Sequence, residues 1–126
     1  MKLAVCIKYI NNSAKISGSV GKSDNFYIYD TLTNRMMDKF TNHFKSSLAA
    51  EIFCAQILIK RGINAVICGK CENDAKKLFK EANIRIIENS ELNPAEIVNL
   101  ISTRVQNNNN AGLEWETILT DISTYH

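Results

Sequence analysis

The sequence lacks a long apolar run, and this absence limits where the protein can act. No stretch approaches the ~18 consecutive apolar residues of a membrane-spanning helix. The opening residues 1–8 are apolar but short and interrupted by lysine. They show neither the apolar region nor the cleavage site of a signal peptide. We therefore expect a cytoplasmic protein with no membrane partner.

The chain also lacks a large excess of charge of either sign. It has 15 basic and 13 acidic residues, a net charge of +2 and a pI of about 8.3. Nucleic-acid-binding domains commonly cluster their lysines and arginines and have a pI above about 9. Here the lysines are spread along the chain, so we predict no nucleic-acid partner.

Disulfide bracing is not expected, although four cysteines are present. Thiols stay reduced in the cytoplasm, so burial, metal binding or catalysis are the roles to weigh. A chain of 126 residues, 45% of them hydrophobic, can bury a core without disulfides or structural metals. The composition thus indicates one compact domain.

Apolar patterning predicts the order β-β-β-α-β-α-β-α. Regular alternation of strand and helix in the second half implies parallel strands, and the hairpin before it implies antiparallel ones. The predicted fold is α/β, with a mixed five-stranded sheet flanked by helices. Its strands are expected at 3–9, 26–29, 35–40, 63–68 and 84–87, and its helices at 47–61, 73–82 and from Pro94 onward. Serine and glycine between residues 11 and 24 indicate a loop.

The domain is expected to end near residue 104. Residues 105–112 include four asparagines in a row and are interpreted as a linker, because they carry little apolar surface. Residues 113–126 contain enough apolar side chains for a short amphipathic tail. This tail could pack on the domain or on a partner, or join two copies as a homodimer.

Three segments of the chain follow a known pattern. They are the opening strand at 1–5, the stretch from Ile16 to Phe26, and the stretch from Ala55 to Gly69. The last two are similar to V-S-x-H-F-G-R-A-x-x-F and A-x-x-L-x-x-x-G-V-D-V-V-I-x-G. In order and spacing the chain resembles the dinitrogenase iron–molybdenum cofactor biosynthesis family, of the NifX and NifB C-terminal type, over roughly residues 1–102.

This resemblance implies a ribonuclease H-like fold and a role in nitrogen fixation. It implies a non-catalytic carrier protein for an iron–sulfur-based metallocluster, such as the iron–molybdenum cofactor or its precursor. Assembly or acceptor proteins would be its partners. Ser19 stands at the family's loop histidine and Lys22 at its arginine. The lost histidine favours an alternative, an interaction or regulatory module that keeps the fold without the cofactor.

The Cys68-Gly69-Lys70-Cys71 motif follows a predicted parallel strand. Ligands bind at the carboxyl ends of such strands, and two thiols there could hold one soft metal ion. His43 precedes the first helix and could supply an imidazole. The predicted metal ligands are therefore Cys71, His43 and Cys68. The alternatives are that both cysteines belong to the core and that His43 is an exposed loop residue.

One pocket at this edge of the sheet would join the 17–23 loop, the 43–47 joint and the 68–71 turn. Lys22 and Lys45 would neutralise the charge of an anionic cluster in this pocket. The predicted cofactor-binding residues are Ser19, Lys22, His43, Lys45, Gly69 and Cys71.

Two catalytic alternatives fail on residue type. Gly21-Lys22-Ser23 superficially suggests a phosphate loop, but Ile16 stands where the upstream glycine is needed and a strand follows instead of a helix. A ribonuclease H-type nuclease needs several carboxylates around two metal ions, and the predicted strand at 3–9 has none. We therefore expect no enzyme.

Overall fold

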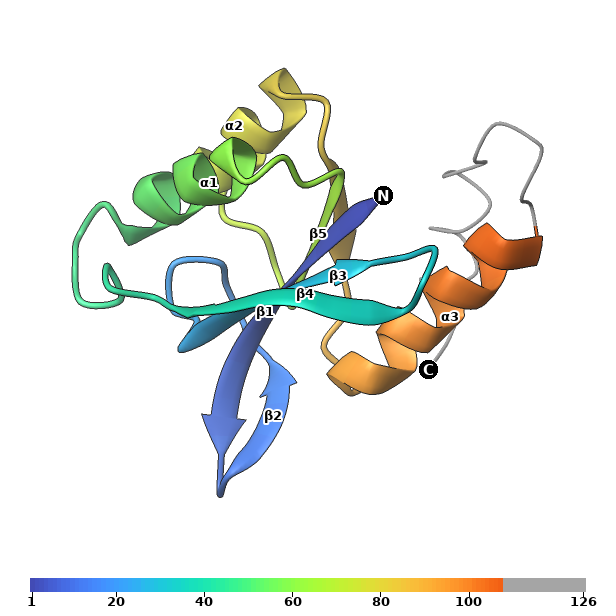
Figure 1. The fold of residues 1–126 in the computed structure, drawn as a ribbon. Coiled ribbons are helices and arrows are strands. Elements are labelled where there is room, and N and C mark those ends of the chain that lie inside the picture. Colours follow the sequence, from blue (N-terminus) through green and yellow to red (C-terminus); the bar gives the residue numbers. More distant parts are fainter. Residues whose placement is uncertain (108–126) are drawn as a thin grey trace.

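The computed structural model describes residues 1–107, with side chains described to residue 103. Figure 1 shows a sheet between two layers of helices. In chain order the elements are β1 (Lys2–Ile10), β2 (Ser13–Ile16), β3 (Asn25–Asp30), β4 (Arg35–Thr41), α1 (Ala50–Lys60), β5 (Ala65–Cys68), α2 (Asn73–Glu81), β6 (Arg85–Glu88) and α3 (Pro94–Asn107).

Strand β1 is the centre of a mixed six-stranded sheet. The strand order is β4-β3-β1-β5-β6, with β2 paired to β1 off this path. Strands β4, β3 and β1 are antiparallel, whereas β1, β5 and β6 are parallel. Ile7 pairs with Asn25 of β3 and with Ile16 of β2, so these two strands lie on opposite edges of β1. Strand β2 therefore continues the edge that β5 occupies at Leu3–Val5.

The two faces of the sheet carry separate cores. Helices α1 and α2 cover one face and α3 covers the other (Figure 1). Because successive strand residues point to opposite faces, β1 sends Ala4 and Cys6 to the α1–α2 side and Leu3, Val5 and Ile7 to the α3 side. The fold is thus a three-layer α/β/α sandwich, as the sequence predicts.

Local signals explain where the helices begin and end. Asn93 Oδ1 accepts a hydrogen bond from the Glu96 backbone N–H at 2.9 Å, and Glu96 Oε1 accepts one from the Asn93 N–H at 3.3 Å. This reciprocal capping box begins α3 as predicted, with Pro94 as its first residue. Gly62 ends α1 with a φ of +74°, a conformation that glycine adopts without strain.

The prediction of five strands missed β2. Asn11 and Asn12 have φ values of 51° and 64°, and these left-handed residues form the two-residue turn of a hairpin between β1 and β2. The serine- and glycine-rich composition concealed a strand of only four residues.

Two helix boundaries also differ from the prediction. Helix α1 begins at Ala50 rather than 47, so Leu48, expected on the inner face, is fully exposed. Ala82 follows α2 and is exposed as well. Helix α3 extends to Asn107. The rest of the predicted linker, at 108–112, and the predicted tail at 113–126 lie outside the described residues.

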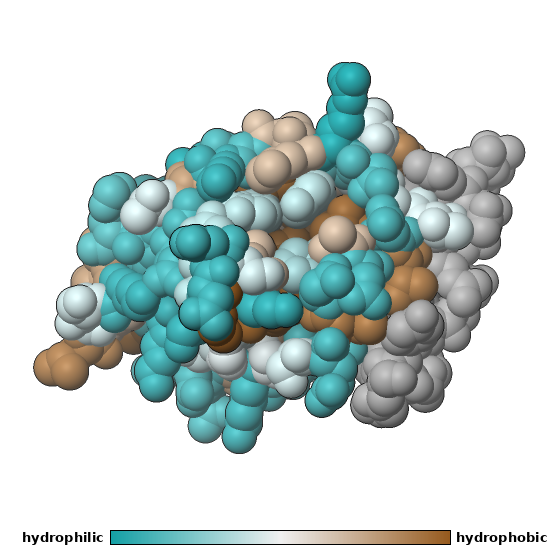
Figure 2. All heavy atoms as spheres, turned by 90° about the horizontal axis from the view of Figure 1, so that it is seen from below, coloured by the Kyte–Doolittle hydropathy of each residue, from teal (hydrophilic) through white to brown (hydrophobic). Residues whose placement is uncertain are grey.

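Hydrophilic side chains cover much of the face seen from below, with apolar side chains near its middle (Figure 2). The described residues expose Tyr9 and Ile10 of β1 and Met36 of β4, among other large apolar side chains. No helix within residues 1–107 is long and apolar enough to cross a membrane.

Candidate functional site

Three loops, which follow β2, β4 and β5, meet at one rim of the sheet. Residues 17–23 join β2 to β3, residues 42–49 join β4 to α1, and residues 69–72 join β5 to α2. The Gly69 N–H donates to the Ser17 carbonyl at 2.7 Å, and the Lys70 N–H donates to the Gly18 carbonyl at 2.8 Å. These backbone hydrogen bonds fix the 68–71 turn against the 17–23 loop.

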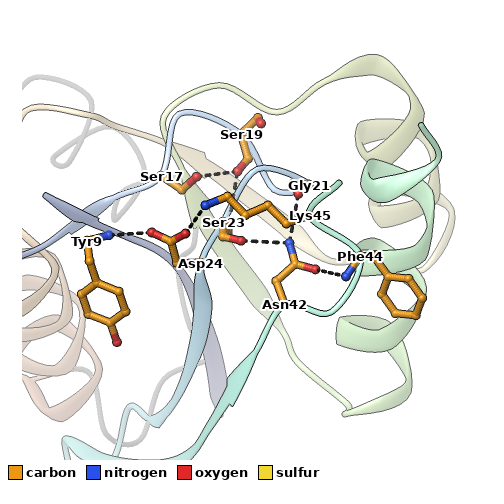
Figure 3. A network of polar contacts seen from close by, with 9 residues as sticks. All are labelled: Tyr9, Ser17, Ser19, Gly21, Ser23, Asp24, Asn42, Phe44 and Lys45. Atoms are coloured by element: carbon orange, nitrogen blue, oxygen red, sulfur yellow. Dashed lines mark hydrogen bonds and ion pairs between the residues drawn. The ribbon is translucent and has the colours of Figure 1, made fainter. Parts of the chain in front are cut away.

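Asn42 ties the same loop to the joint before α1 (Figure 3). Its Nδ2 donates to the carbonyl oxygens of Gly21 and Ser23, each at 2.9 Å. Its Oδ1 accepts from the Phe44 N–H at 2.9 Å and from the Cys54 thiol at 3.2 Å. Because the amide is buried and its hydrogen bonds reach three segments, Asn42 determines how the loop sits on the domain.

Gly21 packs against the first turn of α1. A Cβ atom placed on Gly21 would lie 2.7 Å from the backbone nitrogen of Glu51, closer than real Cβ atoms approach. The Gly21 N–H donates to Glu51 Oε1 at 2.7 Å. The loop can therefore reach the beginning of α1 only because this residue has no side chain.

Two buried oxygens beside this contact have no hydrogen-bond partner. They are the hydroxyl of Ser19 and Oε2 of Glu51. Ser19 is only 6% exposed, and its carbonyl accepts the hydroxyl groups of Ser17 at 2.8 Å and Ser23 at 3.1 Å. An unsatisfied buried polar atom costs about 1–3 kcal/mol. Each such atom in a folded protein calls for an explanation, and Ser19 is one of the predicted cofactor-binding residues.

The predicted cationic and imidazole groups lie on the outer side of the rim. Lys22 and His43 are exposed. Lys45 forms an ion pair with Asp24. The hydrogen bond from Lys45, followed by one from the Tyr9 backbone N–H, holds the pKa of Asp24 below its usual value. The charge of Lys45 is thus already neutralised within the domain, which the sequence did not predict.

All four cysteines lie in the core between the sheet and the α1–α2 layer, and all are free thiols. Burial raises the pKa of Cys6 and raises that of Cys54 to about 11. Cys68 is fully buried and Cys71 is 2% exposed, so both predicted turn ligands face the core rather than open solvent.

The predicted metal ligands do not form a preassembled site. Within residues 1–107, no group of three or more His, Cys, Asp or Glu side chains is arranged to hold one metal ion. The set of Cys71, His43 and Cys68 is therefore not gathered around one point.

Sequence reasoning missed three residues that organise the rim: Asn42, Glu51 and Glu88. Asn42 follows a predicted strand, and asparagine at such a position commonly accepts a hydrogen bond from a backbone N–H two residues later. Its bond to Phe44 could therefore have been predicted from the sequence. Glu51 lies in the first turn of α1, where acids are favoured. Glu88 accepts a hydrogen bond from the Cys71 N–H at 2.7 Å, a contact with no local signal.

Comparison with solved structures finds several proteins that share this fold. The apo form of the orange protein from Desulfovibrio gigas aligns with a TM-score of 0.68 at 21% identity, covering 78% of this chain and 83% of that one. A candidate NifB protein from Thermotoga aligns at 0.64 with 16% identity, covering 83% and 89%. A candidate dinitrogenase from Methanocaldococcus jannaschii aligns at 0.58 with 21% identity, covering 82% and 88%. At these identities the likeness shows the fold.

The sequence itself gives the family. No curated protein matches it. The profile of the family described as "Dinitrogenase iron-molybdenum cofactor" matches residues 1–104, which include every element that forms the rim. With this match and the shared fold, the chain belongs to the dinitrogenase iron–molybdenum cofactor family.

Proposed function

We propose that this protein is a non-catalytic carrier domain in the cytoplasm for an iron–sulfur-based cluster, such as the iron–molybdenum cofactor or its precursor. It would receive this cargo from one assembly protein and release it to another. The observation that carries the proposal is the meeting of three loops at one rim, where backbone hydrogen bonds join the 17–23 loop to the 68–71 turn and Asn42 joins the same loop to the segment before α1.

The residues at the rim suit a preassembled cluster better than a bare metal ion. Such a cluster brings its own sulfide ions, so the protein needs to add few ligands. The exposed Lys22 could offset the charge of an anionic sulfide, and the exposed His43 could ligate iron. Cys68 and Cys71 are enclosed by the core, so we leave them out of the contact. Lys45, paired with Asp24, would contribute less than Lys22.

The placement of the acidic residues argues against one catalytic class, the two-metal nuclease. A two-metal nuclease requires carboxylates gathered around both ions. The whole of β1 carries no acid, and the part of the chain up to residue 107 has no suitable group of three ligands.

Anaerobic loading tests the proposal. The full chain would be mixed with isolated iron–molybdenum cofactor, desalted, and assayed for protein-bound iron and molybdenum. We expect the wild type to retain both metals and the Lys22→Ala, His43→Ala double variant to retain at least tenfold less. Lys80→Ala, an exposed lysine at the far end of α2, is the matched control and should retain as much as the wild type. Full retention of both metals by the double variant, an equal loss in the control, or no binding by the wild type would contradict the proposal.

A second candidate, a protein-interaction module, is favoured by a hollow on the outer side of α1. Its volume is about 500 Å³, and it is lined by Phe44, Phe53, Gln56, Ile57, Ile59 and Lys60. Phe44 and Phe53 are in contact, with their ring centroids 5.1 Å apart. If a second copy occupies this hollow, light scattering of the full chain should give the mass of two chains, and Phe53→Glu should give that of one. If the wild type and Phe53→Glu both have the mass of a single chain, a dimer through this hollow is excluded.

A further inference from the structure

The Cys68–Cys71 pair forms a distinct unit within the core. Cys68 is the last residue of β5, and Cys71 precedes Glu72, the N-cap residue of α2. Both side chains belong to the cluster between the sheet and the α1–α2 layer. The two residues between them lie nearer the surface, since Gly69 is half-buried and Lys70 is exposed. The pair thus sits directly beneath a two-residue surface turn.

The two thiols interact with each other in opposite roles. The hydrogen bond from Cys68 lowers the pKa of Cys71, and Lys76 acts in the same direction, against burial and the charges of Glu51 and Glu88. The same hydrogen bond, together with burial, raises the pKa of Cys68. Cys71 is therefore the better nucleophile of the two, and Cys68 holds the proton.

The surroundings distinguish oxidation from metal binding at this pair. Two thiolates around a monovalent ion would carry a net negative charge, buried among apolar side chains such as Phe79 and close to Glu51 and Glu88. Two thiolates around a divalent ion would be neutral, but such an ion needs more than two ligands. No third ligand completes such a site within the described residues. A disulfide is neutral and needs no further ligand, so burial opposes it far less.

We propose that Cys68 and Cys71 are a redox-active pair that closes to an intramolecular disulfide when hydrogen peroxide or another small hydroperoxide reaches the turn. Cys71, being 2% exposed, is open only to small oxidants. This inference is independent of cluster binding, because neither sulfur belongs to the proposed contact with the cargo.

The chemistry balances in two steps. The Cys71 thiolate sulfur attacks one peroxide oxygen, the O–O bond breaks, and a sulfenic acid forms while the other oxygen leaves as hydroxide and takes up the proton that Cys71 lost. The Cys68 sulfur then attacks the Cys71 sulfur, the S–O bond breaks, and water leaves with the Cys68 proton. For hydrogen peroxide, two thiols are oxidised by two electrons and two water molecules are produced.

Closing this bond would act on the rim. The turn that carries the two sulfurs is hydrogen-bonded to the 17–23 loop through Gly69 and Lys70. It also packs tightly against that loop, since a Cβ on Gly69 would lie 3.1 Å from the Cα of Gly18. A shift of the turn therefore displaces the loop that holds Ser19.

Thiol counting on the full chain tests the pair without any cluster. The reduced protein would be treated with hydrogen peroxide, quenched with catalase, denatured in N-ethylmaleimide and weighed by mass spectrometry. We expect half of the four thiols to escape alkylation, a peptide map that links Cys68 to Cys71, and full recovery of alkylation after dithiothreitol.

Variants identify the partners. Cys68→Ser and Cys71→Ser should each abolish the disulfide, whereas Cys54→Ser, a buried thiol in the same cluster, should retain it. The wild-type peptide map is decisive even if a variant fails to fold. Four alkylated thiols after peroxide, a bond to Cys6 or Cys54, or over-oxidation of Cys71 without a disulfide would each overturn the inference.

Discussion

The two faces of the sheet are built from different chemistry. The face under α3 is packed by aliphatic side chains such as Leu3, Ile67 and Ile97. The face under α1 and α2 holds all four thiols and, at its carboxyl rim, the buried amide of Asn42 and the unpartnered hydroxyl of Ser19. The difference indicates a division of roles: the α3 face holds the sheet by plain burial, and the α1–α2 face combines packing with reactive and polar groups.

The largest expected effect compares one core residue from each face. Phe79→Ala on α2 should cost about 3–5 kcal/mol of unfolding free energy and Ile97→Ala on α3 about 2–5 kcal/mol, since both side chains are fully buried. Urea unfolding measures both. Phe79→Ala should also speed the reaction of the native thiols with maleimide, and Ile97→Ala should leave that rate near the wild-type value. Equal rates in both variants would break the division between the faces.

A smaller effect is expected at the rim. Gly21→Ala places a methyl group against the backbone of Glu51, and we expect a loss of about 1–3 kcal/mol from the forced shift. Gly18→Ala is the matched control, because a Cβ there meets nothing within 4 Å. Thermal unfolding of both variants checks the prediction, and a similar loss at Gly18 would show that general loop stiffness, not this contact, is being measured.

Alkaline pH should weaken the α1–α2 face. Burial raises the pKa of Cys54 from 9.0 to about 11, so the unfolded chain loses this proton first. The stabilisation is complete below pH 9 and is lost as pH rises from 9 toward 11, at about 1 kcal/mol per pH unit for each such thiol. Urea midpoints between pH 8 and 11 under reducing conditions measure the loss. Cys54→Ala should lose less unfolding free energy over this pH range than the wild type. An identical pH dependence in the two proteins would show that Cys54 does not cause the loss.

The smallest effect concerns the helix on the other face. Asn93→Ala removes the side-chain half of the capping box and should cost about 1 kcal/mol. Asn73→Ala makes the same substitution at the first residue of α2, a helix with no side-chain cap, and should change stability by less than half as much. Chemical denaturation of both variants is the measurement.

The sequence predicted what local rules determine. The capping box at Asn93 and the helix end at Gly62 follow from residue type. The 17–23 loop meets the 68–71 turn as expected, but the loop reaches this rim by way of β2, which is antiparallel to β1. Strand β2 escaped prediction because four residues give too short an alternation to separate a strand from a loop.

Contacts between side chains distant in sequence could not be predicted. Asn42 and Lys45 bond to groups 19 to 21 residues away, and no pattern within either segment selects those partners. The burial of Cys71 depends likewise on how α2 packs after the turn. Such contacts decided which predicted site residues stay available: Lys22 and His43 remain on the surface, and Lys45 is paired.

The central position of β1 has a consequence for biosynthesis. Within this domain β1 is made before every other strand, yet its parallel partner at Leu3 is Ala65 of β5, which follows only after both hairpins and α1 have been made. Until then one edge of an apolar β-forming segment stays open to other nascent chains. Lys2 and Lys8 flank that segment as charged gatekeepers against aggregation. The strand that organises the finished sheet is thus the one that waits for its parallel partner until β5 has been made.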